Sequence, residues 1–266
     1  DAEPRRRLDL GYRRALERFL HDNAIELLVS HGLRYDFHAA LAARRTGRPH
    51  VVSRAVALWD EGYSPLARGM FAAVDAWTLR ACDRIIAVSQ ASKQRMATTQ
   101  HLDAERITVI PNGVLVRRPS AEERARIRSE LDPAGDAVIV GAVGQLIARK
   151  AFHLLIEAAA QLAVRPLVVV VGEGPERARL EAAARTRGVR LVLPGYRPDA
   201  PAWMAAFDVA VLPSRAEGMP LVVLEAMGLG VPCVATAAAG TAEIIENEAS
   251  GLLVPVDDVA SLAAAL

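Results

Sequence analysis

The sequence of 266 residues is short of several features, and each shortage argues against a class of protein. Its two cysteines, Cys82 and Cys233, lie far apart and do not suggest a disulfide framework, so a reducing cytoplasm is expected. No secretion signal opens the chain, and no uninterrupted apolar run reaches the length of a membrane span. The net charge of +1 gives no reason to expect a nucleic-acid partner.

Charge is divided unevenly between the two halves of the chain. Residues 1–118 hold 19 Lys and Arg against 13 Asp and Glu, a net of +6, whereas the remainder holds 13 against 18, a net of −5. Residues 5–20 place apolar side chains at helical spacing with arginines on the other face, which predicts a basic amphipathic helix. We favour packing of this helix on its own sheet. Peripheral contact with anionic lipid at the inner face of the membrane is the alternative.

Short apolar strands alternate with helical patterns and predict an α/β fold with parallel sheets covered on both faces. The hydrophobic content of 52% supports well-filled cores. The expected strands cover residues 25–30, 50–54, 84–88, 107–110, 138–143, 167–172, 190–193, 208–212 and 232–235. The expected helices cover residues 5–20, 36–46, 68–80, 152–163, 176–187, 199–206, 220–230 and 241–247, with Ser89 as the cap of a further helix.

We predict two domains from this pattern. The first covers residues 1–118, and the second covers residues 138–266. Residues 119–137 are rich in charge and contain Pro133 and Gly135, which is typical of a connection. The chain begins and stops inside helical patterns, so both ends are expected to be truncated.

In the second half, four polar or glycine-containing loops follow predicted strands. They are residues 144–150, 172–175, 195–197 and 214–217. Because ligands of parallel sheets bind beyond the carboxyl ends of the strands, we expect these loops to share one edge. Lys150 is of interest because 30 of the 32 basic residues are arginine, and a compact ammonium suits a phosphate group.

The stretch from Glu217 to Glu225 carries the strongest functional signal. Pro220 fits the first turn of a helix, so Glu217 precedes that helix and Glu225 lies inside it. Residues 221–231 are apolar apart from Glu225, which predicts a buried helix and a buried carboxylate. The helix start between the two acids attracts anions. A ligand with hydroxyl-rich ends and a central phosphate matches this layout, and a purely structural role for either acid is the alternative.

His31 and Gly32 follow the first predicted strand, where α/β folds place ligand-facing loops. They are weaker candidates for a ligand site, because a lone histidine at a strand end more often has a structural role.

With these residues assembled, the sequence resembles the retaining glycosyltransferases of family 4, whose GT-B fold has two Rossmann-like domains. The most specific part of the resemblance is the E-x7-E pair of Glu217 and Glu225. Four further motifs occur in the family's order, at residues 86–89, 109–114, 144–150 and 251–255.

The resemblance implies a donor site for a nucleotide diphosphate sugar, with Glu217 and Lys150 as its catalytic residues. Glu217 would contact sugar hydroxyls, Glu225 the ribose and Lys150 the diphosphate. The base would lie near Tyr196 and Arg197. The other implied donor-binding residues are Gly144, Gln145, Gly218, Met219, Pro220 and Leu221. The acceptor would be a carbohydrate or lipid-linked hydroxyl in polysaccharide or glycolipid synthesis, with no metal and no cofactor besides the donor.

Three positions depart from the family pattern. Gln145 replaces an arginine, Ala151 replaces a glycine, and Val56 stands where many members have a histidine. The family's opening strands and closing helix are expected to be missing, so weak donor binding and slow turnover are expected of this fragment. A nucleotide-sugar epimerase of similar fold and a non-catalytic donor-binding or scaffold module are the alternatives.

Overall fold

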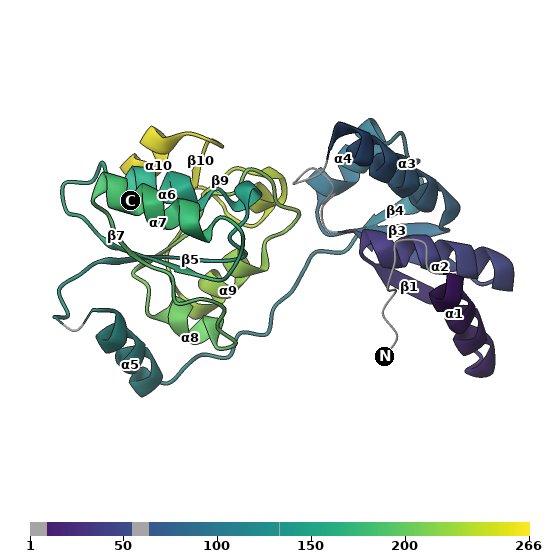
Figure 1. Cartoon of the computed structure of the whole chain (residues 1–266), viewed down its shortest axis with the longest axis horizontal. Coiled ribbons are helices and arrows are strands. Elements are labelled where there is room, and N and C mark those ends of the chain that lie inside the picture. The colour runs from purple at the N-terminus through teal and green to yellow at the C-terminus, as the bar shows by residue number, and fades with distance from the viewer. Residues whose placement is uncertain (1–9, 55–63, 133) are drawn as a thin grey trace. The chain divides into compact units, whose positions relative to one another are not determined.

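The computed structural model describes residues 10–54, 64–132 and 134–266. The chain divides into two compact units, Asp1–Pro111 and Asn112–Leu266 (Figure 1). Each unit has a parallel sheet flanked by helices, so the α/β prediction is confirmed. The sequence placed the end of the first domain at residue 118.

The first unit has a four-stranded sheet in the sequential order β1-β2-β3-β4. Consecutive parallel strands are joined through helices, as a parallel sheet requires. Val52 and Ile85 of the inner strands, and Ile107 of the edge strand β4, pack with Leu79 and Met96 from the helices. The strands are β1 (Leu28–His31), β2 (His50–Arg54), β3 (Arg84–Ala87) and β4 (Ile107–Val109). The helices are α1 (Leu10–Asp22), α2 (Leu33–Thr46), α3 (Pro65–Ala81), α4 (Gln90–Thr99) and the short η1 (Ala104–Arg106).

The structure tests two sequence predictions for helices of the first unit. Ser89 caps α4 by accepting a hydrogen bond from Ser92 N at 3.1 Å, as predicted. Helix α1 packs mainly against α2, and not on the sheet as predicted; it buries Leu20, while Phe19 is exposed. Within the described residues, no helix is both long and apolar enough to cross a membrane.

A group of charged side chains is buried in the first unit. Arg54, the last residue of β2, places Nη2 2.9 Å from Asp36 Oδ2 and 2.7 Å from Asp75 Oδ1. Ser30 Oγ donates to Asp36 Oδ1 at 2.6 Å and lies 2.8 Å from His50 Nε2. Burial raises the pKa of Asp36 despite the opposing effects of Arg54 and Ser30. Two carboxyl groups therefore share one guanidinium where water does not reach them.

The second unit has a six-stranded parallel sheet in the order β10-β9-β8-β5-β6-β7. Numbered from β5, this is the strand order of a Rossmann fold, whose direction of winding reverses between its first and fourth strands. The reversal falls between β5 and β8. The strands are β5 (Ile139–Val143), β6 (Leu167–Val171), β7 (Arg190–Val192), β8 (Val209–Leu212), β9 (Cys233–Thr236) and β10 (Leu252–Val254). The helices are α5 (Ala121–Leu131), η2 (Ala148–Lys150), α6 (Phe152–Ala159), α7 (Arg177–Arg187), α8 (Ala200–Ala205), α9 (Leu221–Leu229), η3 (Ala239–Glu243) and α10 (Val259–Ala265).

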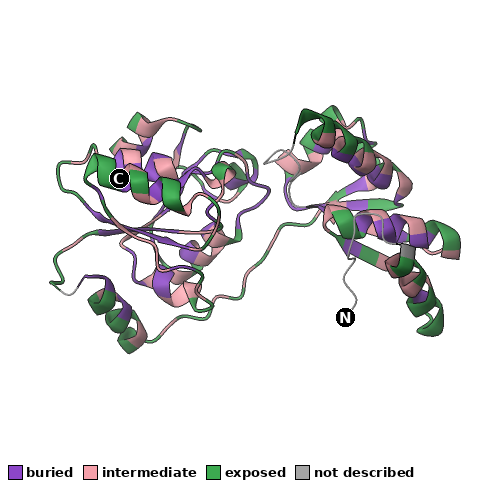
Figure 2. Ribbon diagram, in the orientation of Figure 1, coloured by how far each residue is buried: buried purple, intermediate pink, exposed green. Residues whose placement is uncertain are grey.

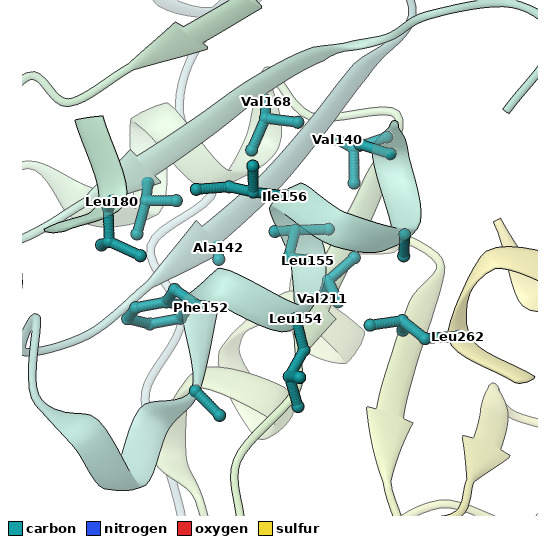
Figure 3. Packing of buried hydrophobic residues seen from close by; sticks show 14 of the residues in the cluster. Val140, Ala142, Phe152, Leu154, Leu155, Ile156, Val168, Leu180, Val211 and Leu262 are labelled. Atoms are coloured by element: carbon teal, nitrogen blue, oxygen red, sulfur yellow. The ribbon is translucent and has the colours of Figure 1, made fainter. Parts of the chain in front are cut away.

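Both faces of this sheet are covered. Figure 3 shows Phe152, Leu155 and Ile156 of α6 packed with Val140 and Val168 of the central strands. A second apolar cluster, which includes residues of α8 and α9, covers the other face. The central strands are buried, whereas the outer surfaces of the helices are exposed (Figure 2). Such a rigid sheet fixes the positions of the loops at its edge.

The structure differs from the sequence prediction in three elements of the second unit. Residues 121–131, predicted as connection, form helix α5, which starts with a capping box between Ser120 and Glu123. The predicted α-helix over residues 241–247 is wrong, because the chain forms only the short 3-10 helix η3 there. Residues 252–254 add the edge strand β10, which was not predicted.

Candidate functional site

Two loops meet where the winding of the second sheet reverses. The loop after β5 covers residues 144–151, and the loop after β8 covers residues 213–220. They are joined by a backbone hydrogen bond from Arg215 N to Arg149 O of 2.9 Å. The predicted common edge is therefore formed at the position where Rossmann-type sheets bind ligands.

The side chains of Lys150 and Glu217 meet between these loops. Lys150 Nζ lies 2.7 Å from Glu217 Oε1, although 67 residues separate them in the sequence. Both side chains are largely buried, with exposed fractions of 13% and 7%. The stem of Lys150 passes beside Gly144, where an added Cβ would lie 3.5 Å from its Cε. The two candidate catalytic residues thus form one buried ion pair.

Arg149 completes the environment of Glu217. Its Nη1 lies 3.6 Å from Glu217 Oε2 and donates to the carbonyl oxygen of Ala216 at 2.8 Å. Arg149 belongs to the loop of residues 144–150, but no role was predicted for it. Its position next to Lys150 is the only signal in the sequence.

The backbone of residues 172–174 packs closely against the loop after β5. A Cβ at Gly172 would lie 1.9 Å from Gly144 O, and one at Gly174 would lie 2.4 Å from Leu146 O. Leu146 N also donates to Glu173 O at 2.8 Å. The glycines of residues 172–174 therefore serve loop packing, which agrees with the tight turn that the sequence suggested.

Replacing Gly172 with alanine is expected to lower the free energy of unfolding by about 2 to 3 kcal/mol, because the methyl group collides with a backbone oxygen. Gly230→Ala is the matched control, since Gly230 also has a positive φ, of 75°, but has open space around its Cβ position. It should cost about 1 kcal/mol. Urea unfolding measures both values, and equal losses would show that the contact with Gly144 is unimportant.

The loop after β8 leads into helix α9. Gly218, Met219 and Pro220 are buried, and α9 begins at Leu221 without a side-chain cap. Pro220 is therefore the cap residue, one position before the first turn in which the sequence placed it. The uncapped amides of the first turn form the positive end of the helix dipole.

Glu225 lies in the second turn of α9 and is only partly buried, which corrects the prediction of a fully buried helix. Leu221 is 47% exposed, while Val223 and Ala226 pack inward. An all-apolar segment has no periodicity, so its sequence cannot show which side packs. Burial nevertheless raises the pKa of Glu225. Within the described residues, this carboxyl group makes no hydrogen bond or ion pair.

Asn112 fastens the start of the second unit to the same loop. Its Nδ2 donates to Met219 O at 2.9 Å, and its backbone N lies 3.1 Å from Met219 Sδ. The Pro-Asn-Gly turn of the sequence therefore orients the segment just before α9.

Tyr196 and Arg197 follow β7 at the same edge of the sheet. Tyr196 is 76% exposed, and the Arg197 guanidinium lies over the ring of Trp203 at 4.8 Å. Gly172 N donates to Gly195 O at 2.9 Å, which joins this loop to the loop after β6. The exposed ring and the stacked guanidinium offer flat surfaces to an aromatic ligand.

The remaining sequence candidates occupy varied environments. Gln145 is exposed, and Ala151 adopts a left-handed conformation with φ 51°, a position that suits glycine. His31 is the exposed last residue of β1, and Gly32 precedes α2 with φ 101°. Val56 lies outside the described residues. Within the described part of the chain, no three His, Cys, Asp or Glu side chains are grouped as a metal site.

The architecture belongs to a known fold class. A Rossmann-type unit preceded by a second parallel α/β unit is the arrangement of the GT-B fold. Residues 137–266 match the family described as "Glycosyl transferases group 1", and residues 2–118 match "Glycosyltransferase Family 4". Models of two glycosyltransferase domains thus match consecutive parts of the chain.

Individual relatives agree with this assignment. The chain is 27% identical over 95% of its length to UDP-Gal:alpha-D-GlcNAc-diphosphoundecaprenol alpha-1,3-galactosyltransferase of Escherichia coli, of which it covers 68%. It is 33% identical over 75% of its length to 2-deoxystreptamine N-acetyl-D-glucosaminyltransferase of Streptomyces fradiae, of which it covers 51%. The chain thus spans between about half and two thirds of the length of these relatives.

Solved structures show the same fold. Anabaena Alr3699/HepE in complex with UDP and glucose matches 98% of this chain with a TM-score of 0.85 and 26% identity, and 73% of that protein is covered. Sucrose-phosphate synthase from Thermosynechococcus elongatus matches 96% of this chain with a TM-score of 0.83 and 23% identity, and 66% of that protein is covered.

Proposed function

We propose that this protein is a retaining glycosyltransferase that moves a hexose-type sugar from a nucleoside diphosphate to an acceptor hydroxyl in polysaccharide or glycolipid synthesis. The observation that carries the proposal is the contact of 2.7 Å between Lys150 and Glu217 at the winding reversal of a Rossmann-type sheet. The UDP and glucose in the HepE complex, and the UDP-galactose in the name of the E. coli enzyme, support UDP as the nucleotide.

Charge explains how this site promotes transfer. The bond between the anomeric carbon and the diphosphate breaks and its electron pair stays with the diphosphate oxygen, so negative charge grows on the leaving group. The acceptor oxygen bonds to that carbon and passes its proton to the leaving diphosphate. Lys150 and the uncapped start of α9 place positive charge there, which stabilises the transition state more than the bound donor. Glu217 orients the sugar through its hydroxyl groups.

The ends of the donor are assigned to other groups at the same edge. Glu225 receives the ribose hydroxyls, the surface formed by Tyr196 and Arg197 receives the base, and the backbone of residues 218–221 holds the diphosphate. Gly144 and Gln145 border the diphosphate from the loop after β5. These assignments extend the E-x7-E resemblance onto the positions that the structure brings to one edge.

The first unit is proposed as the acceptor side, with His31 and Gly32 at the carboxyl end of β1 as its candidate residues. The E. coli relative is named for a diphosphoundecaprenol-linked acceptor, which supports a lipid-linked acceptor here. A cytoplasmic enzyme at the inner face of the membrane, with the basic helix α1 as a peripheral contact, fits such an acceptor.

The proposal includes no metal and no resident cofactor, because Lys150 and α9 supply the charge that a cation would bring. Treatment with EDTA is therefore expected to leave the rate of transfer unchanged. A rate restored only by added Mg²⁺ or Mn²⁺ would contradict this part of the proposal.

The direct test is a thermal-shift panel of UDP-, GDP- and ADP-sugars, followed by assays of nucleotide release. A true donor at 100 times its Kd should stabilise the protein by about 2.7 kcal/mol. Release of the nucleoside diphosphate only in the presence of acceptor would establish transfer. Interconversion of the sugar without acceptor would indicate an epimerase, and binding without either reaction would indicate a non-catalytic module.

Glu225→Gln is expected to weaken UDP binding by about tenfold while raising the melting temperature at neutral pH by roughly a degree or two. The raised pKa means that burial favours the protonated carboxyl group. The protonated carboxyl group of Glu225 therefore stabilises the folded protein at pH values below its unfolded pKa, and this contribution is lost as the pH rises through the raised folded pKa. Glutamine does not ionise, so the variant avoids that loss. The gain in stability should therefore vanish in acid.

The comparison ligand is 2′,3′-dideoxyuridine diphosphate, which lacks the proposed partner hydroxyls and should bind both proteins alike. Glu130→Gln, at an exposed acid of α5, is the matched control. An equal loss of affinity for both nucleotides in Glu225→Gln would rule out the ribose contact.

A further inference from the structure

The carboxylate of Glu217 has one cation at each of its oxygen atoms. Lys150 Nζ lies 2.7 Å from Oε1, and Arg149 Nη1 lies 3.6 Å from Oε2. The exposed fractions of the three side chains are 7% for Glu217, 13% for Lys150 and 18% for Arg149. Two neighbouring residues of one loop therefore neutralise the same buried acid.

Donor binding creates a competition for one of these cations. In the proposed function, Lys150 neutralises the diphosphate, yet without a donor its ammonium group is held by Glu217. A buried carboxylate that loses its only cation is costly, because water no longer solvates it. If Lys150 were the only partner of Glu217, this cost would be subtracted from the affinity for every donor.

Arg149 is held in place by hydrogen bonds of both its side chain and its backbone. Its Nη1 donates to Ala216 O at 2.8 Å, and its own carbonyl oxygen accepts from Arg215 N at 2.9 Å. The planar guanidinium carries five donors in a fixed arrangement, so it can hold the carbonyl and the carboxylate together. Lys150, by contrast, has a flexible stem with a compact charge at its end.

We propose that Arg149 is a positioning residue that keeps Glu217 paired and oriented toward the sugar while Lys150 turns to the donor diphosphate. The inference rests on the proposed function and adds a division of labour between two adjacent cations. Arg149 stays paired with Glu217 throughout, whereas Lys150 exchanges Glu217 for the diphosphate when the donor binds. Together, Arg149 and Lys150 keep the carboxylate of Glu217 oriented toward the sugar.

The test is a double-mutant cycle of Arg149→Met and Glu217→Gln, with UDP affinity measured by calorimetry. Arg149→Met should weaken UDP binding by at least about tenfold, because Lys150 must then leave an unpaired carboxylate behind. In the Glu217→Gln background, where no carboxylate needs a partner, the same change should cost less than about twofold. Arg149→Lys should recover part of the affinity.

The cycle separates this inference from its alternatives. Equal losses in both backgrounds would mean that Arg149 only anchors the loop through Ala216 or contacts the nucleotide directly, and either result would overturn the proposal. Undiminished UDP binding by Arg149→Met would also overturn it. Arg187→Met, which removes an arginine paired with Glu157 at 2.9 Å outside both loops, is the matched control. Failure of the unaltered protein to bind any nucleoside diphosphate would instead refute the proposed function itself.

Discussion

Replacing Lys150 with methionine is expected to lower the rate of sugar transfer by roughly a hundred- to a thousandfold. Methionine keeps the length of the side chain but removes the only lysine charge in the second unit, so the leaving diphosphate loses its compact cation. The loss should appear mainly in kcat, because the interaction strengthens as negative charge develops on the leaving group. Steady-state kinetics at several donor concentrations separates kcat from KM.

The chain contains a natural control for this substitution. Lys93 on α4 is the other of its two lysines, and Lys93→Met should transfer sugar at the unaltered rate. A Lys150→Met enzyme that keeps kcat and shows only a raised KM would mean that the lysine binds donor and transition state equally. That outcome would remove Lys150 from the catalytic residues and leave it as a binding residue.

Arg54→Met is expected to reduce the free energy of unfolding of the first unit by about 3 to 5 kcal/mol. The substitution leaves the buried carboxyl groups of Asp36 and Asp75 without the guanidinium that both contact. Burial already raises the pKa of Asp36, which shows that Arg54 does not fully offset its desolvation. Hydrogen exchange of the β2 and β3 amides measures the loss in this unit alone.

The matched variant is Arg54→Met combined with Asp36→Asn and Asp75→Asn, in which the charges are removed together. Since no buried carboxylate remains, most of the lost protection should return. Unchanged exchange in Arg54→Met would mean that the ion pairs contribute little to the fold. Asp36→Asn alone should cost less than Arg54→Met, because the raised pKa shows that the charged form of Asp36 is disfavoured by its burial.

The alternation of strands and helices was predictable because each strand of a parallel sheet is a short apolar run with its own signal. Helix α5 was not predicted, because its charged composition resembles a connection, although the capping pair Ser120 and Glu123 was visible in the sequence. The α-helix predicted over residues 241–247 does not form, and the chain makes the 3-10 helix η3 instead. Gly240 N in this segment donates to Glu217 O at 3.5 Å, a contact between loops that no local pattern encodes.

The candidate site was predictable as a set of motifs but not as an arrangement. Because residues 144–150 and 214–217 both follow predicted strands, they were predicted to share one edge of the sheet. The structure joins them through Lys150 and Glu217. The role of Arg149 depends on a distance that no local pattern encodes. For the same reason the group formed by Asp36, Arg54 and Asp75 was not predictable, because its members come from three separate elements.

The pairing of β5 with β8 has a kinetic consequence. Val140 and Gly141 meet Val209 and Ala210 across a sequence separation of 69 residues, so this contact closes a long loop of chain. Such non-local contacts are slow to form, since the chain loses the entropy of closure before it gains the contact. Lys150 and Glu217 flank that pairing, and neither loop alone presents both charges. Nucleotide binding during refolding would therefore report the pairing of β5 with β8 rather than the earlier formation of helices.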